Sequence, residues 1–351
     1  MKFVVPVSVF LSLISIASAD GGAAHQVKQS TPVKMGTSGG SANDRSSAFC
    51  CGGTLGALVL RDGVLCILSN NHILARSGSA AAGEDTVQPG LIDSNCSATN
   101  SNIVGDFASN YVPLGSANVD AALSTARSGQ VDTTGAIIDI GPPRTTVQAP
   151  SVGLAVMKSG RTTGFTTGSI TAINASVSIQ YQKGCNQGKK FTVTFTNQIV
   201  TGAMSAGGDS GSLLVSNDGT PNPVGLLFAG SGSTTIYNPA QDVVNAFAAG
   251  GHTFSFVGSA PLTADSLVNR EKRFQTPTPE DMEMALQAKL ENEGELMKTP
   301  GVLGVGIGAA EDNPFESAIV VLFDRSYISR LPDRLDGFKL RVIVTDPIVA
   351  Q

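Results

Sequence analysis

Short apolar runs bounded by Gly, Pro, Asn and Ser recur along the chain between about residues 49 and 240. This spacing is typical of short strands joined by tight turns, as in barrels and sandwiches. The clearest pair is 53–60 and 64–69, because Asp62-Gly63 between them supplies hairpin turn chemistry. Further strands are predicted at 118–125, 134–140, 151–158, 168–181, 190–200, 211–216, 223–229 and 233–237. The fold class is therefore predicted to be mainly β.

Helical periodicity is confined to two places. Residues 239–249 begin with Pro, carry apolar residues at helical spacing and stop at Gly250-Gly251, which predicts a closing helix. A charged helix is predicted over 278–297, with Thr278 as N-cap and Pro279 in the first turn. Its apolar residues near one face predict core packing: Met282, Leu286, Leu290 and Met297. Strands at 302–307, 318–323 and 340–344 complete a small α+β unit.

The charge density changes along the chain and suggests domain boundaries. Residues 265–351 hold 25 of the 51 charged side chains, and this change in charge density begins within a linker-like stretch at 258–277. We expect a β unit at 48–257 and a small α+β accessory domain at 278–351. Residues 20–47 are rich in Gly, Ser and Lys without periodicity, which predicts an extended N-terminal arm.

The first residues have the order of a secretory signal peptide. Met1-Lys2 precede an apolar run, and Ala17-Ser18-Ala19 offers a small-residue cleavage site. We expect 1–19 to be removed near Ala19 and the mature chain to be secreted, to the medium or the periplasm. No other apolar run has the length of a membrane span, so no membrane partner is expected for the mature form.

Composition excludes some classes of function. The net charge of −5 lacks the basic excess of nucleic-acid binders, so no nucleic-acid partner is expected. Five cysteines in an exported chain permit disulfides, and their odd number leaves at least one without an intramolecular partner. No C-x-x-C pair or suitably spaced His indicates zinc, so no metal is expected. Disulfide pairing and oligomeric state cannot be deduced.

The strongest chemical signal is the run Gly207-Gly208-Asp209-Ser210-Gly211 before an apolar strand. Flanking glycines let a substrate carbonyl approach the Ser210 hydroxyl, while the N–H groups of Gly208 and Ser210 face the developing oxyanion. A Gly-rich hairpin turn is the alternative for this motif taken alone.

A nucleophilic serine needs a base, and three histidines are available. His25 lies in the predicted arm and His252 beyond the closing helix, whereas His72 directly follows an apolar strand, so His72 is the predicted base. Asp120, beside an apolar segment, is the predicted orienting acid, with Asp93 and Asp106 as rivals. The order His72, Asp120, Ser210 is that of the chymotrypsin arrangement.

These motifs resemble the bacterial chymotrypsin-like proteases of the streptogrisin and alpha-lytic kind. The resemblance rests on Lys158–Ile170 (KSGRTTGFTTGSI), Gly232–Pro239 (GSTTIYNP), the Ser210 motif and NNHIL at 70–74, and covers roughly 48–250. It implies two antiparallel six-stranded β-barrels with the His72–Asp120–Ser210 triad in the cleft between them. It also implies hydrolysis through an acyl-enzyme, without a cofactor.

This chain departs from that family at several cysteine positions, where it has Met157, Thr167, Met204 and Ile73. It also lacks a basic residue followed by Ile-Val-Gly-Gly, so activation by a newly freed N-terminus is not expected.

The predicted specificity pocket comprises Met204, Phe228, Ala229, Gly230 and Ser231. No carboxylate stands where a trypsin-like pocket needs one, and no histidine is there to receive glutamate, so medium apolar side chains are the expected fit.

The predicted function is a secreted serine endopeptidase acting on a protein or peptide substrate. Two alternatives remain: a self-processing protease with little activity in trans, and a non-catalytic binding or scaffold protein on a protease fold. The C-terminal unit resembles a small accessory module of such proteases, and its run 301–308 is predicted to be a Gly-rich strand rather than a phosphate-binding loop.

Overall fold

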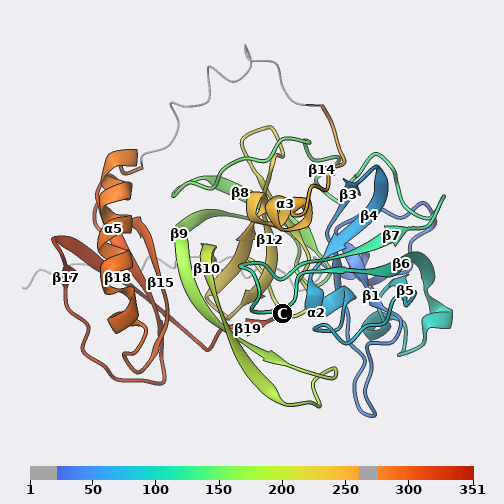
Figure 1. The fold of residues 1–351 in the computed structure, drawn as a ribbon, viewed down its shortest axis with the longest axis horizontal. Coiled ribbons are helices and arrows are strands. Elements are labelled where there is room, and N and C mark those ends of the chain that lie inside the picture. The colour runs from blue at the N-terminus through green and yellow to red at the C-terminus, as the bar shows by residue number, and fades with distance from the viewer. Residues whose placement is uncertain (1–21, 261–275) are drawn as a thin grey trace, which may run out of the picture.

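The structure is a computed structural model that describes residues 22–260 and 276–351. The predicted signal peptide (1–19) and most of the predicted linker (258–277) lie outside the described residues. The mainly β fold class is confirmed, because two large curled sheets form most of the molecule (Figure 1).

The first sheet holds eight strands of the described chain. In the order of their hydrogen-bonded neighbours they are β14 (Phe254–Phe256), β3 (Ala57–Arg61), β4 (Val64–Ser69), β7 (Ala122–Ala126), β6 (Asn102–Tyr111), β5 (Asp85–Gln88), β1 (Thr37–Ser41) and β2 (Gly53–Leu55). Gly56 alone separates β2 from β3, so one chain segment joins the two ends of this curled sheet. Leu58, Ile67, Leu68 and Phe107 are among the buried residues inside it.

The second sheet contains a closed barrel and an extension. Its strands follow the order β10 (Lys190–Gly202), β13 (Thr234–Pro239), β12 (Pro223–Gly230), β11 (Leu213–Ser216), β8 (Ala155–Gly160), β9 (Gly164–Gln182), β15 (Val302–Ala309), β16 (Ser317–Asp324), β18 (Phe338–Thr345) and β17 (Arg334–Leu335). Because β10 also pairs with β9, the first six strands close on themselves. A six-stranded antiparallel barrel results, as the sequence predicted.

The C-terminal strands continue the barrel sheet. β8 pairs with the first part of β9 only, and β15 pairs antiparallel with its middle, from Val177↔Gly304 to Ala172↔Gly308. Helix α5 (Pro279–Leu296) packs on β15 and β16 (Figure 1). On α5, the buried Lys289 ammonium donates to Ser176 Oγ of β9 at 3.0 Å and pairs with Glu293. The α+β unit predicted at 278–351 is therefore hydrogen-bonded to the predicted β unit.

The remaining helices are short. They are α1 (Ala23–Gln26), α2 (Asn71–Leu74), the 3-10 turns η1 (Leu91–Asp93) and η2 (Ala98–Asn100), and α3 (Ala240–Ala248). The closing helix predicted at 239–249 corresponds to α3, and the charged helix predicted at 278–297 to α5. No helix of the described residues has the length and apolar character needed to cross a membrane.

The structure differs from the sequence-based predictions in three places. The described part of the arm predicted at 20–47, residues 22–47, is not extended on the surface, since β1 within it is completely buried between β2 and β5. Its small residues show no alternation because both faces are covered. Residues 134–140 make only isolated bridges, such as Ile137 with Met35. On α5, Leu290 is 57% exposed, whereas the small Ala285 and Ala288 pack inward.

Two disulfides and one thiol account for the five cysteines. Cys50 pairs with Cys96, Cys51 pairs with Cys185, and Cys66 is free and buried. The odd cysteine predicted from the count is thus Cys66, inside the first sheet.

Candidate active site

His72 and Asp120 form a direct contact at the junction of the two sheets. β4 leads through Asn70 into α2, which carries His72, and Asp120 lies just before β7. His72 Nδ1 donates to Asp120 Oδ2 at 2.6 Å, and the His72 backbone N–H donates to Oδ1 at 3.3 Å. Asn70 Nδ2 donates to the Asp120 carbonyl at 2.7 Å. Asp120 is fully buried, so this carboxylate holds the imidazole in one orientation.

Tyr181 of β9 is a third member of this cluster that sequence reasoning missed. Its hydroxyl donates to Asp120 Oδ2 at 2.9 Å, and its ring meets the His72 ring edge-on with centroids 5.9 Å apart. Burial and the neighbouring Asp120 charge raise the pKa of Tyr181 well above its ordinary value, so the phenol stays neutral and donates. The only sequence signal is alternation along β9, where Val177, Ile179 and Tyr181 all point inward.

The protonation of His72 is set by opposing effects. Burial lowers the pKa of His72, but the charge of Asp120 and its hydrogen bond raise it, and the net pKa lies above the ordinary value. The Gln351 carbonyl and the more distant Asp44 act in the same direction. A histidine held this way accepts a proton readily and keeps it in a fixed position.

Ser210 lies in a glycine turn held against the first sheet. Its carbonyl accepts from Thr54 N at 2.8 Å, and the backbone of Gly211, at φ +96°, passes so close to Thr54 that a Cβ there would lie 2.1 Å from the Thr54 carbonyl oxygen. Only glycine fits at residue 211. The Ser210 hydroxyl donates to the Phe228 carbonyl at 3.0 Å. Among the hydrogen bonds of the described residues there is none between Ser210 and His72.

The two predicted oxyanion donors have free N–H groups. In the ranges that the structure describes, neither Gly208 N nor Ser210 N donates to any acceptor, whereas the intervening Asp209 N donates to Ala206 O. Gly208 lines the cavity that also borders His72. Unpaired amides facing a cavity are suited to receive an anionic oxygen.

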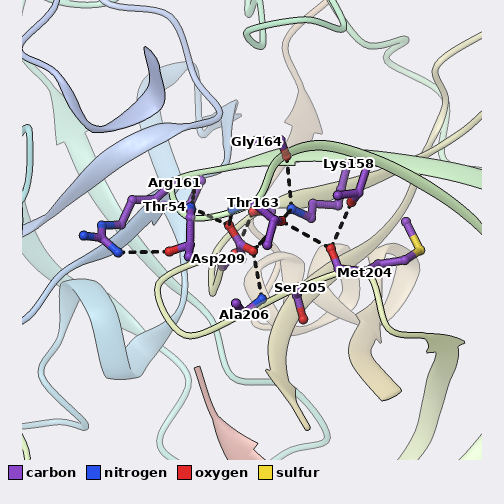
Figure 2. A network of polar contacts seen from close by, with 12 residues as sticks. Thr54, Lys158, Arg161, Thr163, Gly164, Met204, Ser205, Ala206 and Asp209 are labelled. Atoms are coloured by element: carbon purple, nitrogen blue, oxygen red, sulfur yellow. Dashed lines mark hydrogen bonds and ion pairs between the residues drawn. The ribbon is translucent and has the colours of Figure 1, made fainter. Parts of the chain in front are cut away.

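A buried ion pair fixes the turn that carries these amides (Figure 2). Lys158 Nζ lies 3.3 Å from Asp209 Oδ2, and both side chains are completely buried. The Asp209 carboxylate also accepts from the backbone N–H groups of Thr162, Thr163 and Ala206 and from the Thr163 hydroxyl. Lys158 donates to Thr163 Oγ1 and to the Gly164 carbonyl. Burial lowers the pKa of Lys158, and Asp209 opposes that effect.

The rival acids and histidines have other partners. Asp93 pairs with Arg161 at 2.6 Å, and Asp106 pairs with Arg127 at 2.6 Å, so neither carboxylate contacts a histidine. His25 is buried and bonds the Gly36 carbonyl at 2.7 Å, while His252 pairs with Asp62 in an exposed position.

Phe228, Ala229 and Gly230 of the predicted pocket belong to β12, and the groove between β12 and β9 is occupied by the chain itself. β19 (Val349–Ala350) pairs antiparallel with β12, with Ala350 opposite Ala229 and Val349 opposite Gly230. The Phe228 carbonyl accepts from Gln351 N at 3.2 Å. Figure 1 shows this end of the chain beside α2.

Two predicted pocket residues have other neighbours. The Ser231 hydroxyl bonds Thr345 and Thr234. The Met204 side chain is buried in the barrel core, where its sulfur accepts from the Tyr237 hydroxyl.

The groove continues into a cavity of about 540 Å³ on the far side of Gln351. His72, Gly208, Cys51 and Cys185 are among the residues that line this cavity. Asp44, Cys51 and Cys185 gather there, and they are the one group of potential metal ligands among the described residues. Both sulfurs are committed to the Cys51–Cys185 disulfide, so the cluster offers no thiolate to a metal.

Comparison with known proteins gives one curated relative and several solved structures. The chain is 34% identical to streptogrisin-A of Streptomyces griseus over 110 residues, which are 30% of this chain and 33% of that protein. The chain thus matches about a third of the relative's length. No protein-family profile matches.

Three solved structures illustrate the structural comparison. A serine protease described as glutamic acid specific shares 18% identity at a TM-score of 0.43, over 64% of this chain and 100% of that chain. An alpha-lytic protease homologue, N4, shares 20% at 0.42, over 64% and 98%. Thermobifida fusca protease A shares 18% at 0.40, over 59% and 92%. The resemblance to bacterial chymotrypsin-like serine proteases is confirmed.

Proposed function

We propose that this chain is a serine endopeptidase in which Ser210 is the nucleophile, His72 the general base and Asp120 the residue that orients the base. The observation that carries the proposal is the 2.6 Å contact between His72 Nδ1 and the buried Asp120 carboxylate. With Nδ1 committed to Asp120, the other ring nitrogen, Nε2, is the one directed to the groove. The partial match to streptogrisin-A supports the same activity class.

In the first half of the reaction, the Ser210 hydroxyl turns from the Phe228 carbonyl toward His72. Its oxygen attacks the substrate carbonyl carbon while its proton passes to His72 Nε2, which yields a tetrahedral oxyanion and an imidazolium stabilised by Asp120. The oxyanion accepts hydrogen bonds from the N–H groups of Gly208 and Ser210. Collapse breaks the peptide C–N bond, and His72 gives its proton to the leaving amine.

The second half repeats these roles with water. A water molecule enters from the cavity beside His72 and Gly208, His72 takes one of its protons, and the resulting hydroxide attacks the acyl-enzyme carbonyl. Ser210 then leaves with the proton returned by His72. Every proton taken by the base is given back, so the cycle requires no cofactor.

Residues 48–257 contain every group used in this cycle, and we assign the chemistry to that part of the chain. Export after removal of 1–19 fits the two disulfides, since such bonds persist in oxidising compartments. A protein or peptide is the proposed substrate.

Self-processing is the second candidate function, and the strand β19 in the groove favours it. A segment of the chain that reaches the catalytic residues lies within reach of being cut by them. Mass spectrometry of the secreted protein and of a Ser210→Ala protein distinguishes the cases: termini found only in the active chain support self-processing, and identical termini contradict it.

The proposed activity is tested by labelling with a fluorophosphonate, which reacts with activated serines without knowledge of the substrate. We expect the native chain and a Gln351→Asp chain, whose groove is more accessible, to be labelled. Ser210→Ala and His72→Ala proteins should lose labelling by several orders of magnitude, as removal of a triad member does. Ser116→Ala is a control, because its exposed hydroxyl bonds only the Pro113 carbonyl. Absence of labelling in both the native and Gln351→Asp chains overturns the proposal.

A further inference from the structure

Residues 348–351 lie in the groove as an extended peptide that is hydrogen-bonded to strands on both sides. β19 pairs antiparallel with β12, and Val349 also pairs with Gln180 of β9. Gln180 N donates to the Ile348 carbonyl at 3.0 Å, and the Ile348 side chain is buried with Phe195 and Phe228. The segment is thus bound as a peptide substrate of this groove would be, through its backbone.

Gln351 occupies the position next to the reacting groups. Its carbonyl oxygen lies 3.2 Å from His72 Nε2. Its N–H and the Ser210 hydroxyl both donate to one atom, the Phe228 carbonyl oxygen, at 3.2 Å and 3.0 Å. The Gln351 backbone N–H thus takes the place expected for the residue before the bond to be cut, although its carbonyl oxygen lies beside His72 rather than on the N–H groups of Gly208 and Ser210. Its side chain accordingly marks the pocket that reads that residue.

The Gln351 side chain enters a pocket of neutral polar groups. Its Oε1 accepts from the Ser205 hydroxyl at 2.6 Å, and the Ser205 hydroxyl is within 2.9 Å of Thr235 Oγ1. The side-chain amide lies against Gly230, where an added Cβ would be 2.5 Å from the amide nitrogen. The absence of a side chain at residue 230 therefore makes room for the amide group.

We propose that this groove selects peptides with glutamine immediately before the scissile bond, and that Ser205 is the residue that recognises the glutamine carboxamide. The inference rests on the proposed function and specifies its substrate class. The segment Ile348-Val349-Ala350-Gln351 represents the acyl side of such a peptide, and the cavity beyond Gln351 accommodates the residues that follow it.

The chemistry of the pocket disfavours competing side chains. A glutamate would bring a carboxylate into a pocket without a cation, since the nearby Lys158 is already paired with Asp209. A leucine would leave the Ser205 hydroxyl without the acceptor that the carboxamide supplies. A neutral side chain that accepts a hydrogen bond satisfies both constraints. The proposed preference of the pocket is thus glutamine, in place of the medium apolar side chain expected from the sequence.

The first experiment varies residue 351, whose side chain fills the pocket, within the full chain. Fluorophosphonate labelling rates are compared for native Gln351 and for Gln351→Glu, Gln351→Leu and Gln351→Ala. Because the bound segment blocks Ser210, the best-fitting residue gives the slowest labelling, and loss of one hydrogen bond corresponds to about a tenfold faster rate. Gln241→Leu on α3 is the matched control, since that exposed glutamine donates a hydrogen bond to Asn245 on the same helix.

The second experiment measures selectivity in trans with the Gln351→Asp chain. Its kcat/KM is measured for acetyl-Val-Ala-Xaa coumarylamides with Xaa as Gln, Glu or Leu. We expect the Gln substrate to be favoured by about tenfold or more, and Ser205→Ala to remove this preference by lowering kcat/KM for the Gln substrate more than for the Leu substrate. Ser116→Ala should retain the preference.

These outcomes separate the two proposals. Labelling that is equal across the Gln351 series, or slower with Glu or Leu, overturns glutamine selection while leaving the peptidase intact. If no variant is labelled, the peptidase proposal fails. The preference of the pocket for glutamine is then tested by measuring the Tm of residue-351 variants in the Ser210→Ala background. There, Gln351→Leu and Gln351→Glu should lower the Tm more than Gln241→Leu does, and equal Tm values overturn the assignment.

Discussion

Tyr181 and His72 both donate to the same oxygen of Asp120, at 2.9 Å and 2.6 Å. The phenol thus shares the charge that orients the imidazole. This arrangement links β9 of the second barrel to α2 of the first, so the geometry of the base depends on the packing of both.

Replacing Tyr181 by Phe removes that donor while keeping the ring. The Asp120 charge is then less neutralised and attracts the His72 proton more strongly, so we expect the pKa of His72 to rise further. His72 works as a base only when neutral, and the acidic limb of the pH–rate profile should therefore move to higher pH. The check is the pH dependence of serine labelling, with Phe191→Leu as a control for ring packing. If the acidic limb of the profile does not move, Tyr181 does not influence the pKa of His72 in this way.

Asp120→Asn should preserve the fold but favour the wrong imidazole tautomer, at a cost on the order of 10⁴ in kcat as in the chymotrypsin triad. Asp93→Asn and Asp106→Asn should be mild, because these carboxylates pair with Arg161 and Arg127 instead. Peptide hydrolysis measures all three. A large loss at Asp93 or Asp106, with Asp120→Asn near normal, reverses the assignment.

Lys158→Met leaves the buried Asp209 carboxylate without its cation. Breaking a buried pair in this way costs about 3–5 kcal/mol, whereas Lys158→Met combined with Asp209→Asn should recover part of that loss. Lys339→Met is the comparison, because its pair with Asp312 lies at the surface, where solvent screens the two charges. Denaturant unfolding gives the three values. Equal losses for Lys158→Met and Lys339→Met would refute the structural importance of the buried pair.

Asp44, which borders the cavity, allows the pH dependence of folding stability to be tested. Burial raises the pKa of Asp44 to about 6, although Arg76 and His72 oppose the effect. A carboxyl whose pKa is raised on folding stabilises the fold below its unfolded pKa, and this contribution is lost as the pH rises through about 6. The change in the free energy of unfolding caused by Asp44→Asn, relative to the native chain, should therefore be more favourable at pH 7.5 than at pH 4. Urea unfolding at the two pH values is the measurement, and an equal effect at both contradicts it.

Much of the architecture could be predicted because local patterns specify it. The hairpin around Asp62-Gly63, the strands of the second barrel and the charged helix after Thr278 each carry their own turn or capping signal. β1 carries none, since its residues TSGGS are small and buried on both faces. The buried face of α5 was misjudged because Ala285 and Ala288 pack closely while the larger Leu290 stays exposed.

The residues of the candidate site likewise fall into those with a local sequence signal and those without one. Ser210 stands out through its glycine-flanked motif, His72 as one of three histidines, and Asp120 as an acid beside an apolar segment. Tyr181 and Gln351 are ordinary residue types whose roles arise from contacts 61 and 279 residues away in the sequence. Such partners emerge only when β9 and β19 are placed against the first barrel.

The pairing of β15 with β9 also determines how strongly residues 348–351 compete for the groove. Since β15, β16 and β18 extend the barrel sheet, and Thr345 at the end of β18 bonds Ser231 and Thr234 beside the groove, the segment remains tethered a few residues from its binding position. Tethers of this length give effective concentrations in the millimolar range or above. A peptide in solution must then exceed that local concentration, or bind proportionately more tightly, before it gains access to Ser210. If the proposed activity holds, the apparent KM of the intact chain is set by its own architecture as well as by the affinity of the groove.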